Sequence, residues 1–384
     1  MNQSDIRPPV PPYPALRDPV ERGGMPRSGK RRSRAGLVRK PVIAITIGDL
    51  NGVGPEVVLK SVATPGVRRL CQPLLIGPLE IFEWCAKQLK LRLRFQPFES
   101  IESTNPAKAI PIYDLGIFHP RDVRFGTLSP IAGTAAGLAL HKGAELCIQR
   151  RVSALVTAPV SKSALNLAGY SYPGQTELLA ELTESENVTM MLVSNNLRIG
   201  LVTVHVPLRD VPPLITIERV FRAITVVDFS LRHDFGIRKP RVAVLALNPH
   251  AGEGGLIGTE DESVVRPAIE MAKTQHIQAF GPFSSDAFFG NYHPEKFNAV
   301  IAMYHDQGLI PLKMSAFGKA VNFSAGLKIV RTSPDHGTAF DIAGKGVANP
   351  SSMIEAITLA VKIGEQRQKQ GVRKSRSRHQ RRSS

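Results

Sequence analysis

Three histidines follow directly on short apolar runs of this sequence. His205 ends the run "GLVTVH", His250 ends "LALNPH" and His305 ends "VIAMYH". Neutral imidazole is a good ligand for zinc and other divalent transition metals, and three histidines that leave one position open form a common catalytic metal site. One histidine in such a place is more often a hydrogen-bonded rim residue, but three in equivalent places predict a divalent metal site.

Polar and charged residues follow the third of these histidines. Asp306 and Gln307 come directly after it, and both are candidates to orient a metal-bound imidazole through its second nitrogen. Lys313 comes soon after, Asn322 stands in the run "AVNFSA", and Arg331 opens "RTSPDHG". Lysine and arginine bind carboxylate and phosphate groups. The sequence therefore predicts an anionic substrate next to the metal.

Glycine-rich segments supply candidate nucleotide contacts, although none is a standard phosphate-binding motif. Residues 46–56 read "TIGDLNGVGPE", and neither G-x-x-x-x-G-K-[ST] nor G-x-G-x-x-G occurs in the chain. The segment "DHGTAF" is predicted to lead into a helix, whose first N–H groups would receive a nucleotide. Thr176 opens another predicted helix and is an anion-site candidate for the same reason. The candidate cofactor contacts are Asp335, His336, Gly337 and Thr338.

Short β-rich runs alternate with helical stretches from residue 41 onward. Strands are predicted at 41–47, 72–77, 153–158, 188–193, 198–204, 241–247, 297–303 and 320–325. Helices are predicted at 54–63, 78–89, 132–150, 215–234, 260–275 and 350–366. Several strands are apolar throughout, which suits strands covered on both faces. The pattern predicts an α/β fold of two α/β/α lobes with mostly parallel sheets.

The domain organisation follows from the length of the body and from the charge of its ends. The net charge of +17 divides into +7 in residues 1–40, +8 in residues 367–384 and +2 in the body. Both basic ends are predicted to be disordered tails, with at most weak, salt-sensitive contact to polyanions. The first lobe is predicted at 41–157 plus 328–366, and the second, with the dimer contacts, at 158–327. The active site is expected in the cleft between them, because ligands gather at the carboxyl ends of parallel strands.

The remaining composition points to a cytoplasmic protein. No apolar stretch approaches the roughly 20 residues that a membrane-spanning helix needs, and the N-terminus lacks the apolar region of a secretory signal. The three cysteines show no C-x-x-C spacing and are predicted to be buried apolar residues in a reducing compartment.

Several longer motifs resemble those of the 4-hydroxythreonine-4-phosphate dehydrogenase family of vitamin B6 synthesis. They include "TAPVSKSAL", "GQTELLAE", "TVHVPLRD", "LNPHAGEGG", "MYHDQG" and "RTSPDHGTA", and the resemblance covers residues 41–366. It implies a fold like that of isocitrate and isopropylmalate dehydrogenases. It also implies a homodimer, NAD bound without the G-x-G-x-x-G motif, and a divalent metal such as zinc, magnesium or cobalt.

Carried over position by position, the resemblance implies the same three metal ligands. The implied substrate contacts are Thr176, Lys313, Asn322 and Arg331. Gln175 stands where the family has a histidine. Glutamine keeps a hydrogen bond there but carries no positive charge, which questions the exact substrate more than the chemistry.

The resemblance implies oxidation of the 3-hydroxyl of 4-phosphohydroxy-L-threonine by NAD, followed by decarboxylation. Asp306 and Lys313 are both candidates for moving the hydroxyl proton, and the sequence does not decide between them. Alternatives are a 4-phospho-D-threonate or 4-phospho-D-erythronate dehydrogenase, a metal-dependent hydrolase or lyase without a redox step, and a nucleic-acid-binding protein. The last leaves the three histidines unexplained.

Overall fold

The computed structural model describes residues 40–100, 108–194, 197–316 and 318–380. The predicted N-terminal tail lies almost entirely outside these residues. The described chain divides into two compact units. The first contains the chain up to Gly143 together with Ala158–Leu178 and Gly337–Ala348, and the second contains Ala144–Thr157, Leu179–His336 and the chain from Asn349 onward. The lobe boundaries drawn from the sequence remain a prediction.

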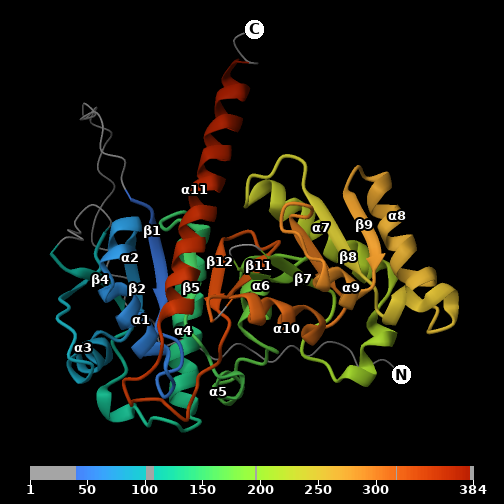
Figure 1. The fold of residues 1–384 in the computed structure, drawn as a ribbon. Helices are drawn as coiled ribbons and strands as arrows, with labels where there is room; N and C mark the ends of the chain where they lie inside the picture. Colours follow the sequence, from blue (N-terminus) through green and yellow to red (C-terminus); the bar gives the residue numbers. More distant parts are fainter. Residues whose placement is uncertain (1–39, 101–107, 195–196, 317, 381–384) are drawn as a thin grey trace, which may run out of the picture. The chain divides into compact units, whose positions relative to one another are not determined.

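The first unit holds a parallel sheet in the order β3-β4-β2-β1, of which Figure 1 labels β4, β2 and β1. Its strands are β1 (Val42–Thr46), β2 (Gln72–Gly77), β3 (Phe95–Pro97) and β4 (Ile110–Asp114). Its helices are α1 (Gly54–Ala63), α2 (Pro65–Leu70), α3 (Leu79–Gln88), α5 (Lys162–Leu167) and the 3₁₀ turn η1 (Pro120–Asp122). Helices α4 (Pro130–Ile148) and α6 (Gln175–Leu182) contribute residues to both units.

The second unit holds a mixed sheet in the order β5-β12-β11-β6-β7-β10-β8-β9. Its strands are β5 (Ala154–Thr157), β6 (Thr189–Val193), β7 (Arg198–Leu201), β8 (Arg241–Leu245), β9 (Gln278–Phe283), β10 (Ala299–Ala302), β11 (Val321–Ala325) and β12 (Arg331–Pro334). The pairs β12–β11, β11–β6 and β6–β7 are antiparallel. The four strands from β7 to β9 are parallel neighbours.

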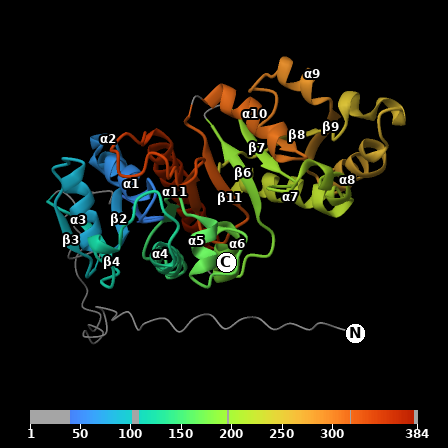
Figure 2. The ribbon, with the colours of Figure 1, turned by 90° about the horizontal axis from the view of Figure 1, so that it is seen from below.

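Helices cover both faces of this second sheet. They are α7 (Ile217–His233), α8 (Arg266–Thr274), α9 (Ser285–Gly290), α10 (His305–Ala316) and α11 (Ser351–Gln380). Short turns are η2 (Leu208–Asp210), η3 (Pro212–Leu214), η4 (Pro249–Gly255) and the π-helical η5 (Asp261–Val265). Figure 2 shows α7 and α10 on opposite faces of the sheet. Because both faces are covered, β8 and β10 are buried along almost their whole length, as their apolar sequences predicted.

The predicted fold class is confirmed: the chain is α/β, with mostly parallel strands. All eight predicted strands are present. Four others, β3, β4, β9 and β12, were not predicted. They are short, contain proline or carry polar residues, as in "RTSP" and "QAFGPF", so they lack the apolar run on which the prediction rested. Among the described residues, no helix is both long and apolar enough to cross a membrane.

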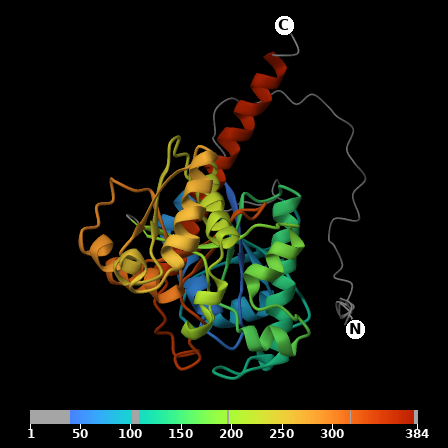
Figure 3. The ribbon, with the colours of Figure 1, turned by 90° about the vertical axis from the view of Figure 1, so that its right-hand side faces the viewer.

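Two local predictions differ from the structure. The segment "DHGTAF" leads into turns rather than into a helix. The C-terminal tail was predicted to be disordered from residue 367, but α11 continues to Gln380, and Figure 3 shows its last turns extending away from the strands. The buried carboxylate of Asp234 explains part of this extension, because its Oδ1 accepts a hydrogen bond from Arg367 Nε at 2.6 Å.

Candidate functional site

The predicted metal ligands of the second unit follow neighbouring parallel strands. His205 comes after β7, His305 after β10 and His250 after β8, and these strands are adjacent in the order β7-β10-β8. Parallel neighbours present their carboxyl ends at one edge of a sheet, which is where α/β proteins bind ligands. The expectation that the three histidines occupy equivalent positions at strand ends is therefore confirmed.

His205 and His305 lie next to each other. Their ring centroids are 5.6 Å apart, with an angle of 41° between the ring planes. The chain after β7 is tied to the end of β10, because the hydroxyl of Thr203 donates to the carbonyl of Met303 at 2.7 Å and the Thr203 N–H donates to it at 3.1 Å. His205 itself has a φ of +50°. A non-glycine residue in this left-handed region is uncommon and is characteristic of functional sites.

Asp306 orients the ring of His305. Nδ1 of His305 lies 2.7 Å from Asp306 Oδ1, at the first turn of α10. A carboxylate only accepts hydrogen bonds, so the proton of a neutral ring sits on Nδ1 and Nε2 carries the free lone pair. This is the arrangement that holds metal-binding histidines in one tautomer.

The side chain of Gln307 bonds to two backbone groups and a serine hydroxyl, whereas the prediction was a contact with an imidazole. Its side chain is buried, Oε1 accepts the N–H of Met303 at 2.6 Å, and Nε2 donates to the carbonyl of Ala246 at 2.6 Å and to Ser285 Oγ at 2.8 Å. These bonds join the ends of β10 and β8 to the start of α9. Gln307 therefore fixes the strand ends from which the histidines project.

His250 begins a left-handed turn. The residues from His250 to Gly254 all have positive φ, between 43° and 77°. Three of them are not glycine, and at roughly 1–2 kcal/mol each they store on the order of 3–6 kcal/mol. The buried carboxylate of Asp261 holds the start of the turn by accepting the N–H groups of Leu247 and Asn248, at 2.7 and 3.0 Å. Strain of this kind persists where the surroundings over-determine it, commonly at functional sites.

The three histidines do not form one coordination cluster within the chain. Among the described residues, no group of three or more His, Cys, Asp or Glu side chains is placed to hold a metal ion. The structure thus brings His205 and His305 together and leaves His250 one strand further along the edge. The assignment of all three as ligands remains a prediction.

Lys313 and Asp335 lie close together in the second unit. Lys313 Nζ is 4.0 Å from Asp335 Oδ2, and the side chain of Asp335 is only 12% exposed. Burial raises the pKa of the Asp335 carboxyl above its usual value, and the nearby Lys313 and His336 offset only part of that rise. A proposed substrate contact and a proposed cofactor contact therefore share one environment.

Two other predicted contacts have buried acceptors without a partner. Asn322 lies in β11 opposite Ser333 and Leu192, and its Oδ1 makes no hydrogen bond. Gln175 begins α6 in the first unit, next to Thr176, and its Oε1 likewise makes none. Buried acceptors are normally satisfied, so each is a candidate to receive a hydrogen bond from a ligand.

Arg331 is buried at 1% exposure and is held by hydroxyl groups. Its Nε and Nη2 donate to Thr157 Oγ1 at 3.1 and 2.8 Å, and its Nη1 donates to Ser324 Oγ at 3.0 Å. The sequence offered no sign of this clamp, because Thr157 is 174 residues away along the chain and both Thr157 and Ser324 are ordinary in type.

The remaining predicted cofactor contacts, Gly337 and Thr338, lie in the first unit beside the loop that precedes α1. The Val53 N–H donates to the Thr338 carbonyl at 2.9 Å. The same loop carries Asp49, which sequence reasoning passed over. Asp49 is fully buried with Oδ2 unpartnered, and burial raises the pKa of its carboxyl despite backbone N–H donors. An Asp after a glycine at a strand end was the available signal.

The fold is that of an α/β protein with a ligand-binding sheet edge, and two adjacent histidines lie at that edge. Residues 69–360 match the family model described as "Pyridoxal phosphate biosynthetic protein PdxA". The chain belongs to this family, the 4-hydroxythreonine-4-phosphate dehydrogenases, and is therefore an oxidoreductase.

The similarity to individual relatives covers nearly all of their length. A 4-hydroxythreonine-4-phosphate dehydrogenase of Trichlorobacter lovleyi is 43% identical over 337 residues, which are 85% of this chain and 99% of the relative. A protein of Oceanobacillus iheyensis named "Putative D-threonate 4-phosphate dehydrogenase" is 41% identical over 331 residues, with 85% and 99% covered. The crystal structure of the Klebsiella pneumoniae 4-hydroxythreonine-4-phosphate dehydrogenase superimposes with a TM-score of 0.78 at 36% identity, covering 85% of this chain and 98% of that one.

Proposed function

We propose that this protein oxidises the 3-hydroxyl of 4-phosphohydroxy-L-threonine, with NAD as hydride acceptor and a divalent metal ion, and that the product then loses CO₂. The observation that carries the proposal is the adjacency of His205 and His305 at the carboxyl ends of two paired parallel strands. The names of the relatives support the choice of substrate. This substrate bears a carboxylate and a phosphate, the groups that lysine and arginine bind.

The donor chemistry at this edge fits a divalent ion. His305 presents Nε2, because Nδ1 is bonded to Asp306, and His205 lies beside it. Imidazole nitrogen favours zinc or cobalt over magnesium, which prefers oxygen ligands. His205 and His305 would hold the metal, which would supply polarisation of the substrate hydroxyl, and bound NAD would supply the hydride acceptor. We assign the third ligand to His250 of a second copy of the chain, so that a homodimer completes the site.

The segment that follows β12 carries a hydrogen-bond acceptor suited to the hydroxyl groups of a nucleotide. The buried carboxyl of Asp335 suits uncharged hydroxyl donors such as those of a ribose. His336, Gly337 and Thr338 continue this segment and are the other proposed NAD contacts.

The substrate contacts divide by charge. Lys313, with an exposed ammonium group, would bind the phosphate or carboxylate directly. Arg331 would act through its fixed positive charge, because hydroxyl groups hold its guanidinium in place. Asn322 and Gln175 would accept hydrogen bonds through their unpartnered oxygens, and Thr176 would donate one.

The proton transfer is assigned to Lys313 rather than to Asp306. Asp306 already accepts from His305, so its role is to position the ring. The Lys313 amino group is only loosely paired, at 4.0 Å from Asp335, and in its neutral form it would take the proton of the substrate hydroxyl. It is therefore free to approach the substrate oxygen.

A second substrate is favoured by one residue. Gln175 replaces the family's histidine with an uncharged amide, and a relative named for D-threonate 4-phosphate is 41% identical. A 4-phospho-D-threonate or 4-phospho-D-erythronate would meet the same metal, lysine and arginine.

The test is NADH formation by the purified enzyme with Zn²⁺ or Co²⁺. The three substrates to compare are 4-phosphohydroxy-L-threonine, 4-phospho-D-threonate and 4-phospho-D-erythronate. The highest kcat/KM with the aminated acid supports the first proposal, and the highest value with either of the others supports the second. NADH formation with none of them, in protein that binds metal, would contradict both.

The proposed location is the cytoplasm, and the basic ends would add only weak polyanion contact.

A further inference from the structure

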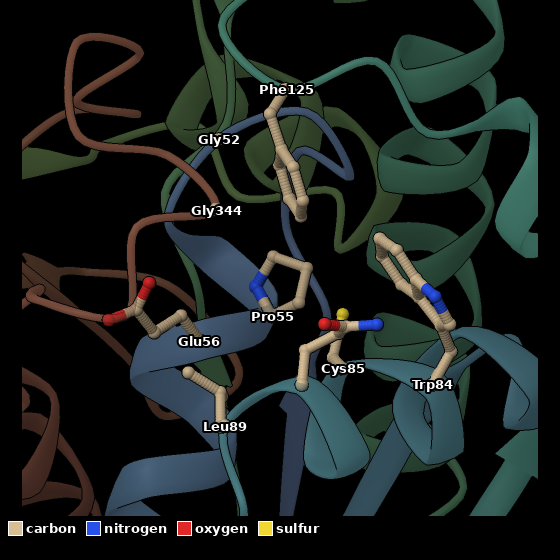
Figure 4. A pocket seen from close by; sticks show the side chains of 9 residues that line it. Gly52, Pro55, Glu56, Trp84, Cys85, Leu89, Phe125 and Gly344 are labelled. Atoms are coloured by element: carbon tan, nitrogen blue, oxygen red, sulfur yellow. The ribbon is translucent and has the colours of Figure 1, made fainter.

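The first unit contains a pocket that none of the proposed substrate, metal or cofactor residues lines. It lies between α1, α3 and the chain around Phe125 and Gly344, with a cavity volume of about 160 Å³. Figure 4 shows Phe125, Trp84 and Pro55 around one common space. An apolar cavity of about 150 Å³ holds a benzene molecule. The pocket therefore has room for a single ring.

The walls of the pocket are aromatic and apolar. Trp84 and Phe125 stack with ring centroids 5.7 Å apart and 17° between their planes. Pro55 and Leu89 add aliphatic surface. The absence of a side chain at Gly344 lets the Phe125 ring pack against its backbone, because a Cβ there would lie 2.3 Å from the ring. Flat aromatic and aliphatic surfaces of this kind favour a flat apolar ligand.

The polar groups at the pocket favour a ligand without charge. Neither lysine nor arginine lines it. The one carboxylate, on Glu56, is 7% exposed, and its Oε1 accepts from Lys60 Nζ at 2.8 Å and from the Ala348 N–H at 2.7 Å. Gln88, at the end of α3, supplies an amide that can donate and accept. A phosphate or carboxylate would lack a counter-charge here. A neutral heteroaromatic ring would find the Gln88 amide and the Oε2 of Glu56, which is buried and makes no hydrogen bond.

We propose that this pocket is a binding site for a free, uncharged heteroaromatic molecule of one ring. The ring packs against Trp84, Phe125 and Pro55, and the amide of Gln88 bonds its ring nitrogen or substituent. None of the proposed NAD contacts Asp335, His336, Gly337 and Thr338 lines the pocket, although Thr338 packs against Gly52 in its wall.

The single tryptophan of the chain makes the proposal testable by fluorescence, because Trp84 lines the pocket. The full-length protein is titrated with 3-hydroxypyridine and with nicotinamide, with excitation at the red edge of tryptophan absorption. We expect saturable quenching by at least one of the two. Gln88→Phe fills the rim of the pocket and should weaken binding roughly tenfold or more.

The matched control is Lys87→Phe, which places the same side chain one residue earlier on α3, outside the pocket lining. It should bind the probe like the wild type. Circular dichroism and thermal unfolding check that both variants fold, and calorimetry repeats the titration without relying on fluorescence.

Three results would overturn the proposal. They are the absence of saturable binding of either probe, equal loss of binding in both variants, and competitive displacement of the probe by NAD. The last result would make the pocket part of the cofactor site. Probe binding that persists with saturating NAD and is lost only in Gln88→Phe supports an independent site.

Discussion

Replacing Asp306 with alanine should weaken metal binding without weakening the fold. Its carboxylate accepts from His305 Nδ1 at 2.7 Å, while its own side chain is 73% exposed. Loss of a carboxylate that orients a metal-bound histidine reduces metal affinity or activity about 10–100-fold. That range corresponds to roughly 1.4–2.7 kcal/mol of binding free energy. An exposed side chain with one such contact changes the free energy of unfolding by only about 0.5 kcal/mol or less.

The assay combines calorimetric titration with Zn²⁺ or Co²⁺, kcat/KM and thermal unfolding. Asp306→Asn keeps an acceptor oxygen and should recover part of the lost affinity. Gln307→Ala is the contrasting variant on the same turn. It leaves the Met303 N–H and the Ala246 carbonyl unsatisfied and buried, which costs about 2–5 kcal/mol of stability.

Two results would refute this reasoning. Unchanged metal affinity in Asp306→Ala would mean that His305 is not a ligand or needs no orientation. A loss of stability in Asp306→Ala as large as in Gln307→Ala would mean that the carboxylate serves the fold.

Three further outcomes are expected. If the site is shared between subunits, mixing inactive His305→Ala and His250→Ala variants should restore up to about a quarter of wild-type activity, whereas a site within one chain would recover none. Because burial raises the pKa of folded Asp335, its carboxyl contributes stability that is fully present below its unfolded pKa and is lost as pH rises through the folded pKa. Asp335→Asn should therefore unfold at higher denaturant concentration than the wild type at pH 7, and the difference should vanish below about pH 4; a less stable variant at pH 7 would contradict this. Burial raises the pKa of the Cys71 and Cys85 thiols to about 12, so thiol reagents at pH 8 should label these two only after unfolding, and their fast labelling in native protein would disprove their burial.

The sequence by itself determined the alternation of strands and helices and the type of chemistry. Apolar runs such as "VIAIT" and "VIAMY" can be predicted as strands from their own composition, because a strand covered on both faces must be apolar throughout. The same logic located His205, His250 and His305 at strand ends. The polar strand β12, "RTSP", was not predicted, because its burial depends on neighbouring strands and helices rather than on its own composition.

Only the tertiary structure decided which of these residues meet. His205 and His305 are neighbours because β7 pairs with β10, a pairing across about a hundred residues that no local pattern encodes. Gln307 was predicted to orient a metal ligand, but its buried side chain instead forms hydrogen bonds that link the ends of β10 and β8. The physical reason is that residue type and local periodicity set what a side chain can do, while strand order and backbone strain set what it touches.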